Sequence, residues 1–554
     1  MSNRLLHTPD GVRDLYGEDY NKKLSIENNI RKVFLDNGYE GIQTPTFEYM
    51  DIFSSEIGTT PSKDLYKFND NEGNTLVLRP DFTPSIARCA AKYFMDEDKT
   101  VRFSYSGNTF SNTNSLQGKL KEVTQMGIEL MNDSSVKADA EAINMLVKSL
   151  INTGLSDFHI SIGNADFFKG ICEEVSLTKD IELILRDYIS VKNIYGAKNY
   201  LLEQNLQQEV IDKLLSVTDI FGQSDSLTQG SKLATNDRSK KALERLIALE
   251  TELKKLDIDK YVSYDLGLLS KYNYYTGIVF KAYTFGVGDA IAKGGRYDNL
   301  LGYFGKEAPA IGFMIVIDDV LSALNNQSNK VNEDRYLTFA LGKGRLANKT
   351  MSYLAKLGIN CEEMLDKDTR KLIFVNEEYK LKFFLAKGPD VPTYVEYGAA
   401  DIGVVGKDTI VEEDRRVFEV LDLGFGKCRM CVCGPKDATE LLSHRERIRV
   451  ATKYPLIAKD YFYNKKHQTV DIIKLNGSVE LGPIVELSDV IVDIVETGST
   501  LRENGLDVLE EIMPLSARMI VNPVSMQMES ERIKELIFKL KKLVEEDNKW
   551  KLLN

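Results

Sequence analysis

A strand followed by a hydroxyl-rich turn near the C-terminal end constrains the fold more than any other stretch of the chain. Residues 490–495 are β-branched and apolar apart from Asp493, a pattern typical of a buried parallel strand. The strand ends at Glu496-Thr497-Gly498-Ser499-Thr500, where three hydroxyls surround a glycine that has no Cβ. Backbone N–H groups in such a turn can form a concave nest for an anion. The turn therefore predicts a phosphate site.

Two acids lie beside this turn. Carboxylates are poor phosphate ligands, but Asp493 and Glu496 suit ribose hydroxyls or Mg²⁺. Phosphate donors next to acids that favour a sugar indicate a phosphorylated sugar as the ligand. Taken alone, the local pattern fits an ordinary strand-to-loop turn with a satisfied aspartate equally well, because short motifs give false positives.

Length, charge and hydropathy exclude several classes of protein. A chain of 554 residues is too long for one core, since domains average about 150 residues. The net charge of −12 argues against a general nucleic-acid binder, which gains affinity from basic surface. The N-terminus has no apolar leader, and nowhere do about 18 apolar residues run together. We therefore expect a cytoplasmic protein that binds neither nucleic acid nor membrane.

Cysteine and histidine do not indicate a metal centre. Six cysteines are too few for a disulfide scaffold in so long a chain. Cys428, Cys431 and Cys433 cluster, but their alternation favours a buried strand and no second ligand pair follows at zinc spacing. Each of the four histidines stands alone, so a histidine-dependent triad is not supported.

Strand and helix patterns in the first 320 residues carry a family resemblance. A helical pattern over about 20–37 precedes a hairpin-like pair at 66–68 and 76–79, and a longer strand pair at 101–105 and 122–129. In this order the residues resemble the catalytic core of histidyl-tRNA synthetase and its paralogue, the regulatory subunit of ATP phosphoribosyltransferase. The resemblance covers roughly residues 5–320, includes a helical insertion at about 167–256, and extends to the segments 272–280, 294–298 and 310–313.

The departures from the synthetase pattern concern its chemistry. Ser111 and Ser270 stand where the synthetases have two catalytic arginines, and Asn273 replaces the neighbouring acid. A guanidinium matches phosphate geometry and serine does not, so adenylation is expected to be lost. No anticodon-binding domain follows, because the chain passes after Asp319 into a polar stretch at 325–330 that reads as a linker.

The residues that the resemblance assigns to amino-acid binding are kept. They are Asp81, Thr83, Gln125, Glu129, Tyr274 and Tyr275. The carboxylates would pair with the ammonium of histidine while the amide and hydroxyls orient the rest of it. The alternative is that these side chains are a polar lining that satisfies itself by internal hydrogen bonds.

The C-terminal half alternates strands with helices and places cations where strands end. Lys343 and Arg345 follow the strand pattern at 336–341 in a glycine-rich stretch, a natural arrangement for binding phosphates. Arg370 stands in a second basic pair. Lone basic pairs are usually solvated surface, but several in one α/β unit favour a function.

This half resembles the short-form catalytic subunit of ATP phosphoribosyltransferase along its whole length. The segments that carry the resemblance are 340–345, 390–408, 422–429, 449–455, 476–480 and the strand and turn at 490–500. Lys387 stands where the family usually has arginine, which loses a bidentate fork. Glu486 stands where the family usually has glycine, which puts in doubt how closely that turn packs.

The two resemblances together imply a fusion of regulatory and catalytic subunits. The expected layout is a synthetase-like antiparallel sheet domain at 1–324, a linker at 325–333 and, at 334–554, two α/β lobes of the periplasmic-binding-protein type. The implied reaction joins ATP and 5-phosphoribosyl 1-diphosphate to give N1-(5-phosphoribosyl)-ATP and diphosphate, the entry step of histidine synthesis. Histidine is expected to inhibit it through the regulatory half, in a homo-oligomer that is a dimer or larger.

The resemblance and the chemistry of displacement at an anomeric carbon give expected roles for the site residues. Lys343, Arg345 and Arg370 are placed at the diphosphate or ATP phosphates, Asp493, Glu496, Thr497, Gly498, Ser499 and Thr500 at the ribose phosphate and hydroxyls, with Asp408, Lys453 and Glu480 completing the site. Mg²⁺ is the expected cofactor, carried on the diphosphate and not by side chains.

Two other classes of function stay open on the sequence alone. The chain could be a working histidyl-tRNA synthetase with an accessory domain, which Ser111, Ser270 and the acidic charge oppose. It could also be a non-catalytic histidine-sensing or solute-binding protein, because a fold does not secure a function. Convergence of Lys343, Arg345, Arg370 and the Thr497 turn on one site would discriminate between them.

Overall fold

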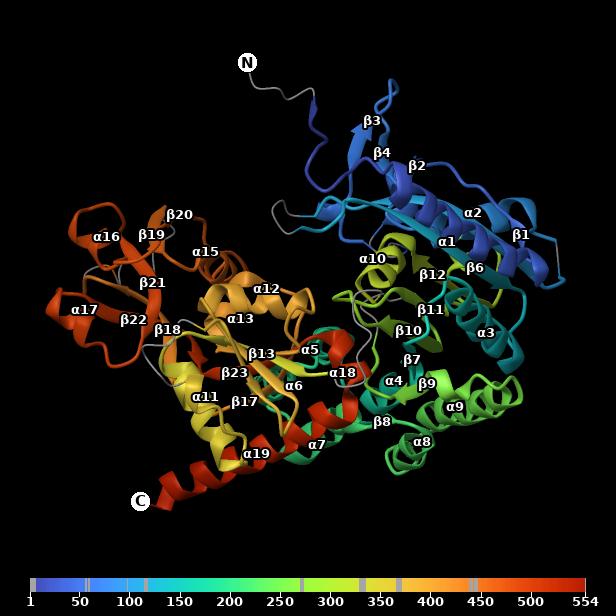
Figure 1. The fold of residues 1–554 in the computed structure, drawn as a ribbon. Helices are drawn as coiled ribbons and strands as arrows, with labels where there is room; N and C mark the ends of the chain where they lie inside the picture. The colour runs from blue at the N-terminus through green and yellow to red at the C-terminus, as the bar shows by residue number, and fades with distance from the viewer. Residues whose placement is uncertain are drawn as a thin grey trace. The chain divides into compact units, whose positions relative to one another are not determined.

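A computed structural model describes residues 6–54, 57, 60–96, 98–113, 118–269, 274–327, 335–364, 371–436, 438, 442 and 447–553. The chain forms two compact units, Met1–Val331 and Asn332–Asn554 (Figure 1). Each unit has its own sheets and its own core, and each is described by itself. None of the helices in these described parts is long and apolar enough to cross a bilayer.

The first unit is built on a nine-stranded sheet that is antiparallel over most of its width. Its strands, in spatial order, are β1 (Glu40–Gly41), β5 (Val101–Phe110), β6 (Glu122–Met131), β12 (Ala310–Val316), β11 (Ala292–Arg296), β10 (Ile278–Thr284), β7 (Phe158–Asn164), β9 (Val262–Asp265) and β8 (Phe221–Gly222). Only β1 with β5 and β7 with β9 pair in parallel. The expected synthetase-like antiparallel sheet is confirmed. A small second sheet has the order β2 (Phe47–Tyr49), β4 (Thr75–Leu78) and β3 (Lys67–Asn69).

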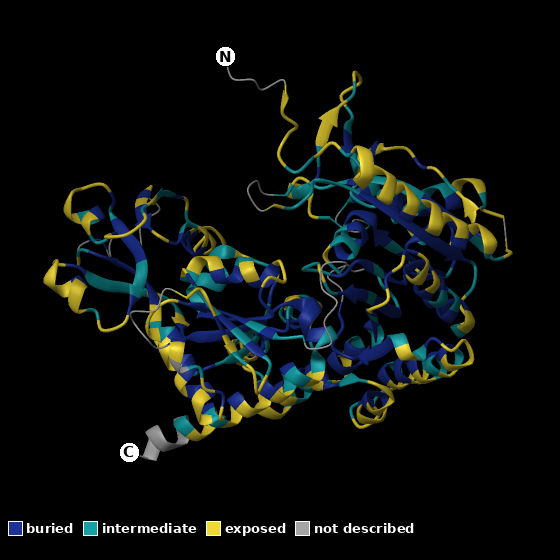
Figure 2. Ribbon diagram, viewed as in Figure 1, coloured by how far each residue is buried: buried dark blue, intermediate teal, exposed yellow. Residues whose placement is uncertain are grey.

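Helices flank this sheet because their apolar stripes need a face to cover. The helices are α1 (Gly17–Asp36), α2 (Thr83–Tyr93), α3 (Val136–Asn152), α4 (Ala165–Glu174), α5 (Lys179–Ser190), α6 (Ile194–Glu203), α7 (Gln208–Ser216), α8 (Ser224–Gly230), α9 (Asp237–Lys255) and α10 (Ile317–Gln327). One core cluster runs from Ile30 of α1 through Ile128 of β6 to Leu246 of α9. Buried residues accordingly concentrate on the sheets, and exposed ones on the outer helix faces (Figure 2).

The end of α10 corrects the expected start of the linker. The polar residues Asn325, Asn326 and Gln327 form the last turn of α10. Asn326 Nδ2 donates to Gly286 O at 2.7 Å, and Gln327 Nε2 donates to Thr284 Oγ1 at 2.8 Å. Their amides therefore bind the end of β10, and the prediction of a linker from residue 325 is wrong for these three positions. The other residues of the expected linker, 328–333, lie outside the described part of the chain.

The second unit holds two mixed α/β sheets. The first has the order β14 (Ile373–Asn376), β15 (Leu381–Ala386), β13 (Leu337–Gly342), β16 (Ile402–Gly406), β23 (Ala517–Val521) and β17 (Phe418–Asp422). The second has the order β20 (Val470–Lys474), β19 (Ile448–Thr452), β21 (Val490–Val495), β18 (Cys428–Gly434) and β22 (Asp507–Leu515). We name these the first and second lobes. The expected two-lobed α/β architecture is confirmed.

The helices of this unit follow the strands in βα order. They are α11 (Arg345–Lys356), α12 (Val391–Glu396), α13 (Lys407–Glu413), α15 (Pro455–Lys459), α16 (Leu481–Ile484), α17 (Ser499–Glu503), α18 (Pro523–Met528) and α19 (Ser530–Leu553). Within the first lobe β15, β13 and β16 run parallel, and within the second β20, β19 and β21 do. The predicted buried strand at 490–495 is β21, and its residues 490–492 are fully buried.

The chain crosses between the two lobes twice, at adjacent places. It leaves the first lobe after β17 and returns to it at Ser516. Leu423 N donates to Ala517 O and Ala517 N donates to Phe425 O, each at 2.9 Å. Ser516 Oγ donates to Asp422 Oδ1 at 2.8 Å. The two crossings are therefore hydrogen-bonded to each other.

Candidate functional site

The carboxyl ends of three parallel strands meet in the first lobe. Gly342, the last residue of β13, lies opposite Ala386, the last of β15, and Lys343 N donates to Ala386 O at 2.9 Å. Lys343 and Lys387 thus follow neighbouring strand ends, and Asp408 follows the end of β16 in the first turn of α13. Ligands of open α/β sheets bind at this edge. The described residues predicted for phosphate binding in this lobe all lie there.

The turn after β13 presents its cations to solvent. Gly344 has φ of +110°, a conformation that glycine adopts without steric cost, and it precedes the first residue of α11, Arg345. The Arg345 side chain is 88% exposed. Lys343 is exposed as well. Both cations are therefore available to a ligand at the strand ends. Arg370, predicted to join them, lies outside the described residues.

The matching edge of the second lobe carries the hydroxyl-rich turn. Lys453 follows the end of β19, and residues 496–500 follow the end of the neighbouring parallel strand β21. Gly498 has φ of +71°, so the turn needs a residue that tolerates the left-handed region. The Thr497 and Ser499 hydroxyls lie 3.0 Å apart, and both residues are exposed, as is Thr500. The hydroxyls are thus held close together on an open surface.

An ion pair brings the edges of the two lobes together. Arg345 Nη2 lies 3.1 Å from Glu496 Oε2, and Nη1 lies 3.3 Å from Oε1. Both side chains are largely exposed, so the pair contributes only about 0–1 kcal/mol. A ligand phosphate can therefore replace Glu496 at the guanidinium for little cost. The predicted phosphate cation of one lobe lies beside the predicted phosphate turn of the other.

The less certain acids and the lysine of the predicted site also come together. Burial raises the pKa of Asp493 to about 6, with Glu480 and Asp408 raising it further and Lys453 lowering it. Burial likewise raises the pKa of Asp408, against the nearby Lys453. The carboxylates thus influence one another across the two lobes. Ionised carboxylates at this place can accept hydrogen bonds from hydroxyl partners such as those of ribose.

Sequence reasoning missed two residues at this site. Arg502 Nη2 donates to Thr497 O at 3.2 Å, and its guanidinium lies against Gly498. The basic residue four positions after the turn glycine was a usable signal. The Tyr454 hydroxyl bonds to Asp408, which together with burial raises the pKa of the phenol. Tyr454 links the lobes through Asp408, a contact that no local pattern reveals.

Within the part of the chain that the structure describes, no group of three or more His, Cys, Asp or Glu side chains is arranged to hold a metal ion. Cys431 and Cys433 are buried in β18, and burial raises the pKa of Cys428 to about 11. These thiols stay protonated at neutral pH or lie in the core, as the buried-strand interpretation predicts.

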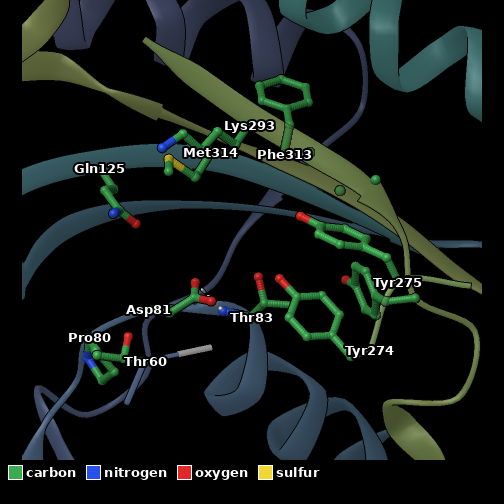
Figure 3. Close-up of a pocket in the computed structure, with 14 residues that line it drawn as sticks. Thr60, Pro80, Asp81, Thr83, Gln125, Tyr274, Tyr275, Lys293, Phe313 and Met314 are labelled. Atoms are coloured by element: carbon green, nitrogen blue, oxygen red, sulfur yellow. Dashed lines mark hydrogen bonds between the residues drawn. The ribbon is translucent and has the colours of Figure 1, made fainter. Parts of the chain in front are cut away.

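A second site is a pocket on the sheet of the first unit (Figure 3). It is lined by Thr60, Pro80, Asp81, Thr83, Gln125, Tyr274, Tyr275, Lys293, Gly294, Gly295, Tyr297, Gly312, Phe313 and Met314. Five of the six residues predicted to bind an amino acid are among them. The sixth, Glu129, lies directly behind, where Thr83 Oγ1 donates to its Oε1 at 2.8 Å. The structure therefore gathers all six.

Glu129 is the buried acid of this pocket. Burial raises its pKa to about 8, while hydrogen bonds from Tyr297 and Thr83 lower it and Asp81 raises it. The Tyr297 hydroxyl donates to Oε2. That carboxylate oxygen occupies the place of a Cβ at residue 312, so only glycine fits at Gly312. The acid is therefore fixed in position but costly to ionise.

Aromatic rings and two further polar groups complete the pocket. The Tyr274 and Tyr275 rings lie 4.5 Å apart, and Tyr297 meets Tyr274 edge-on at 6.0 Å. Gln125 is buried, and its Oε1 accepts no hydrogen bond from any residue that the structure describes. Lys293, which sequence reasoning did not single out, also lines the pocket. Its position just before Gly294 and Gly295 gave no signal, because it enters the pocket through strand register.

Adenylation chemistry has no support at the described position. Ser111 follows the end of β5, and its backbone N donates to Lys121 O at 2.8 Å. A short hydroxyl stands there in place of a guanidinium. Ser270 and Asn273 lie outside the described residues.

Comparisons with known proteins match a different family within each of the two units. The family described as Histidyl-tRNA synthetase matches residues 11–320, and the family described as ATP phosphoribosyltransferase matches residues 387–542. An ATP phosphoribosyltransferase of Lachnoclostridium phytofermentans is 71% identical over 212 residues, covering 38% of this chain and 99% of that protein. An ATP phosphoribosyltransferase regulatory subunit of Acetivibrio thermocellus is 38% identical over 335 residues, covering 60% of this chain and 80% of that protein.

Among solved structures, one of similar fold comes from Bacillus halodurans. It is described as an ATP phosphoribosyltransferase regulatory subunit/histidyl-tRNA synthetase, and it matches with a TM-score of 0.55 and 27% identity over 69% of this chain and 99% of that chain. The fold and the comparisons define a phosphoribosyl-transferring enzyme joined to a synthetase-like domain. The chain belongs to the ATP phosphoribosyltransferase family, with a catalytic region of the short form fused to a regulatory-subunit region.

Proposed function

We propose that phosphoribosyl transfer takes place between the strand ends of the two lobes in the second unit. There 5-phosphoribosyl 1-diphosphate would give its phosphoribosyl group to N1 of ATP, with diphosphate leaving. The observation that carries this assignment is the Arg345–Glu496 ion pair. It places a phosphate-binding cation of one lobe beside the hydroxyl-rich turn of the other.

The residues divide by the part of the substrate that each would bind. The Thr497 to Thr500 turn would hold the 5-phosphate with its hydroxyls and N–H groups, supported by the left-handed Gly498. Asp493 and Glu496 would accept hydrogen bonds from the ribose hydroxyls. Lys343 and Arg345 would neutralise the diphosphate or the ATP phosphates, with Arg370 as a further candidate.

The chemistry asks for charge stabilisation more than for proton transfer. Displacement at the anomeric carbon passes through an oxocarbenium-like state, while negative charge develops on the leaving diphosphate. Cations held at the strand ends stabilise that charge, so no side-chain nucleophile is needed. Mg²⁺ carried on the diphosphate would add charge neutralisation there.

We further propose that histidine binds the pocket of the first unit and inhibits transfer in the second. Asp81 and the buried Glu129 would supply acids for the ammonium, and the tyrosines walls for a ring, while Gln125 Oε1 has no donor among the described residues. Fusion keeps the two halves at one-to-one stoichiometry and at high effective concentration. Histidine would act by favouring one arrangement of a homo-oligomer over another.

One assay tests these proposals together. The full chain is mixed with ATP, 5-phosphoribosyl 1-diphosphate and Mg²⁺, and phosphoribosyl-ATP is followed by its absorbance with and without histidine. We expect product only when all three are present, and a lower rate with histidine. An unchanged rate at millimolar histidine would overturn the regulatory proposal. Histidine-dependent exchange of diphosphate into ATP would instead reveal synthetase activity.

A further inference from the structure

A lysine side chain, that of Lys293, lies on the wall of the pocket in the first unit. Lys293 is the cationic residue among the described residues that line this pocket. It enters from β11, where it lies opposite Met314 of β12, which lines the same pocket. The lysine and the acid on the pocket wall form a pair of opposite charges. Such a pair is complementary to a zwitterionic ligand, which carries one positive and one negative group.

The two charges lie on different walls. Figure 3 shows Asp81 and Thr83 on one side of the pocket, with Lys293 and Gln125 facing them from the other. Asp81 is oriented by a hydrogen bond from Thr83 N to its Oδ1 at 3.2 Å. The Gln125 Oε1, buried and without a described donor, points to a missing ligand group that carries N–H. An amino acid brings an ammonium and a carboxylate to such a pocket at once.

The surroundings of Lys293 leave it able to bind an anion. Its Nζ lies 3.2 Å from Asp289 Oδ2, and Asp289 is 43% exposed, so this ion pair is weak. An ammonium carries three donors, so it can bind more than one acceptor at a time. Asp319 lies nearby, and Lys281 pairs with Lys293 across the strands. The two lysines together balance the charges of the two acids, so these four side chains present no net negative charge to an incoming carboxylate.

We propose that Lys293 binds the α-carboxylate of the amino acid whose ammonium lies at Asp81. This inference rests on the proposed histidine pocket and adds to it a basis for selection. Ligands that keep the imidazole and the amine but lack the carboxylate would lose one of the two charged contacts. The pocket would therefore discriminate an amino acid from the corresponding amine.

The test compares histidine with histamine, which lacks only the carboxylate. Binding of each ligand to the full chain and to Lys293→Met is measured by calorimetry. For the natural chain we expect histidine to bind about 10- to 100-fold more tightly than histamine, the range for a hydrogen bond to a charged group. Lys293→Met should lose that advantage for histidine and bind histamine as before. Unchanged histamine binding also establishes that the variant is folded.

A second variant predicts a change in the opposite direction. Asp289→Asn removes the acid that competes for the Lys293 ammonium, and asparagine can still accept the hydrogen bond that Ala290 N gives to residue 289. Histidine should bind about 2- to 5-fold more tightly to this variant, with histamine unaffected. A mere packing role for Lys293 would not produce this gain.

The outcomes separate this inference from the proposal beneath it. If the natural chain binds histidine but Lys293→Met still prefers histidine to histamine, the role of Lys293 is overturned while the histidine pocket stands. Equal binding of both ligands by the natural chain also overturns it. If the natural chain binds no histidine, the proposed regulatory function falls.

Discussion

The pocket of the first unit and the strand ends of the second unit solve opposite problems. In the pocket the acid Glu129 is buried and accepts hydrogen bonds from Thr83 and Tyr297. At the strand ends the charged groups are open to solvent, with Arg345 88% exposed. A site that only recognises a ligand can be fixed in advance. The proposed phosphate site, which would neutralise several charges, keeps its cations open to solvent.

Glycine serves the two sites in different ways. In the pocket, Gly312 is needed because the Glu129 carboxylate occupies the space of a Cβ. At the strand ends, Gly344 and Gly498 are needed for their positive φ of +110° and +71°. One use brings a side chain close to a strand, and the other lets the chain turn after a strand. The distinction between a packed pocket and an open turn is thus already present in the backbone.

The largest expected effect is a loss of catalysis at the strand ends of the second unit with no change in the pocket of the first. Arg345→Ala should lower kcat/KM for phosphoribosyl transfer by about 100- to 1000-fold, the usual loss when one group that stabilises transition-state charge is removed. Histidine binding should not change, because the pocket lies in the other unit. Steady-state kinetics and calorimetry measure the two quantities.

The matched control for this variant is Lys349→Ala. Lys349 is an exposed cation one turn further along α11. It should leave kcat/KM unchanged. A loss of less than tenfold in Arg345→Ala, or an equal loss in the control, would contradict the assignment.

A smaller change separates the two substrates within the catalytic site. Thr500→Ala removes one hydroxyl from the proposed phosphate turn and should weaken 5-phosphoribosyl 1-diphosphate by about 10-fold or more, with ATP much less affected. Thr500→Ser keeps the hydroxyl and should restore binding. Dissociation constants for each substrate test this, and an equal loss for both would count against placing the ribose phosphate there.

The pocket should respond to pH through its buried acid, Glu129. Because the pKa of Glu129 is raised to about 8, its carboxyl is mostly protonated at pH 7. An ammonium favours the ionised form, so histidine binding should release a proton and strengthen about fivefold between pH 7 and pH 8. Calorimetry in two buffers of different ionisation enthalpy counts the proton. Glu129→Gln should release none, and proton uptake by the natural chain would exclude the assignment.

The smallest effect concerns a turn remote from both sites. Glu486 has φ of +57°, a conformation that costs a residue with a Cβ about 1 kcal/mol or more, and its carbonyl accepts from Arg449 Nη1 at 2.9 Å. Glu486→Gly should therefore stabilise the second unit by about 1 kcal/mol and raise Tm by about 2–4 °C. Glu486→Ala, which keeps the Cβ, should give no gain. A lower Tm for the glycine variant would contradict the strain.

Local patterns predicted those parts of the fold that local forces determine. The β-branched run became β21, and the turn glycine Gly498 adopts the positive φ that its sequence context indicated. The departure at Glu486 foreshadowed a real conformational demand, since the turn keeps the left-handed conformation with glutamate in place of glycine.

Tertiary pairings were beyond the reach of local patterns. Arg345 and Glu496 are 151 residues apart, and only the packing of two lobes makes them neighbours. Lys293 reaches the pocket because register places it beside Met314. Asn326 and Gln327 looked like linker by composition, yet carbonyl and hydroxyl acceptors near the end of β10 hold them in a helix. The polarity of a segment does not reveal whether the folded chain supplies hydrogen-bond acceptors for its side chains.

The paired crossings between the lobes show that the second lobe is inserted into the chain of the first lobe. Residues 428–515 depart and return where Ala517 N already bonds to Phe425 O. A chain joined directly from Gly426 to Ser516 would keep every strand of the first lobe's sheet. The first lobe could therefore fold without the second, whereas most of the proposed site residues, from Lys453 to Thr500, belong to the second lobe. The proposed catalytic site thus depends on an inserted lobe that the first lobe does not need to form its own sheet.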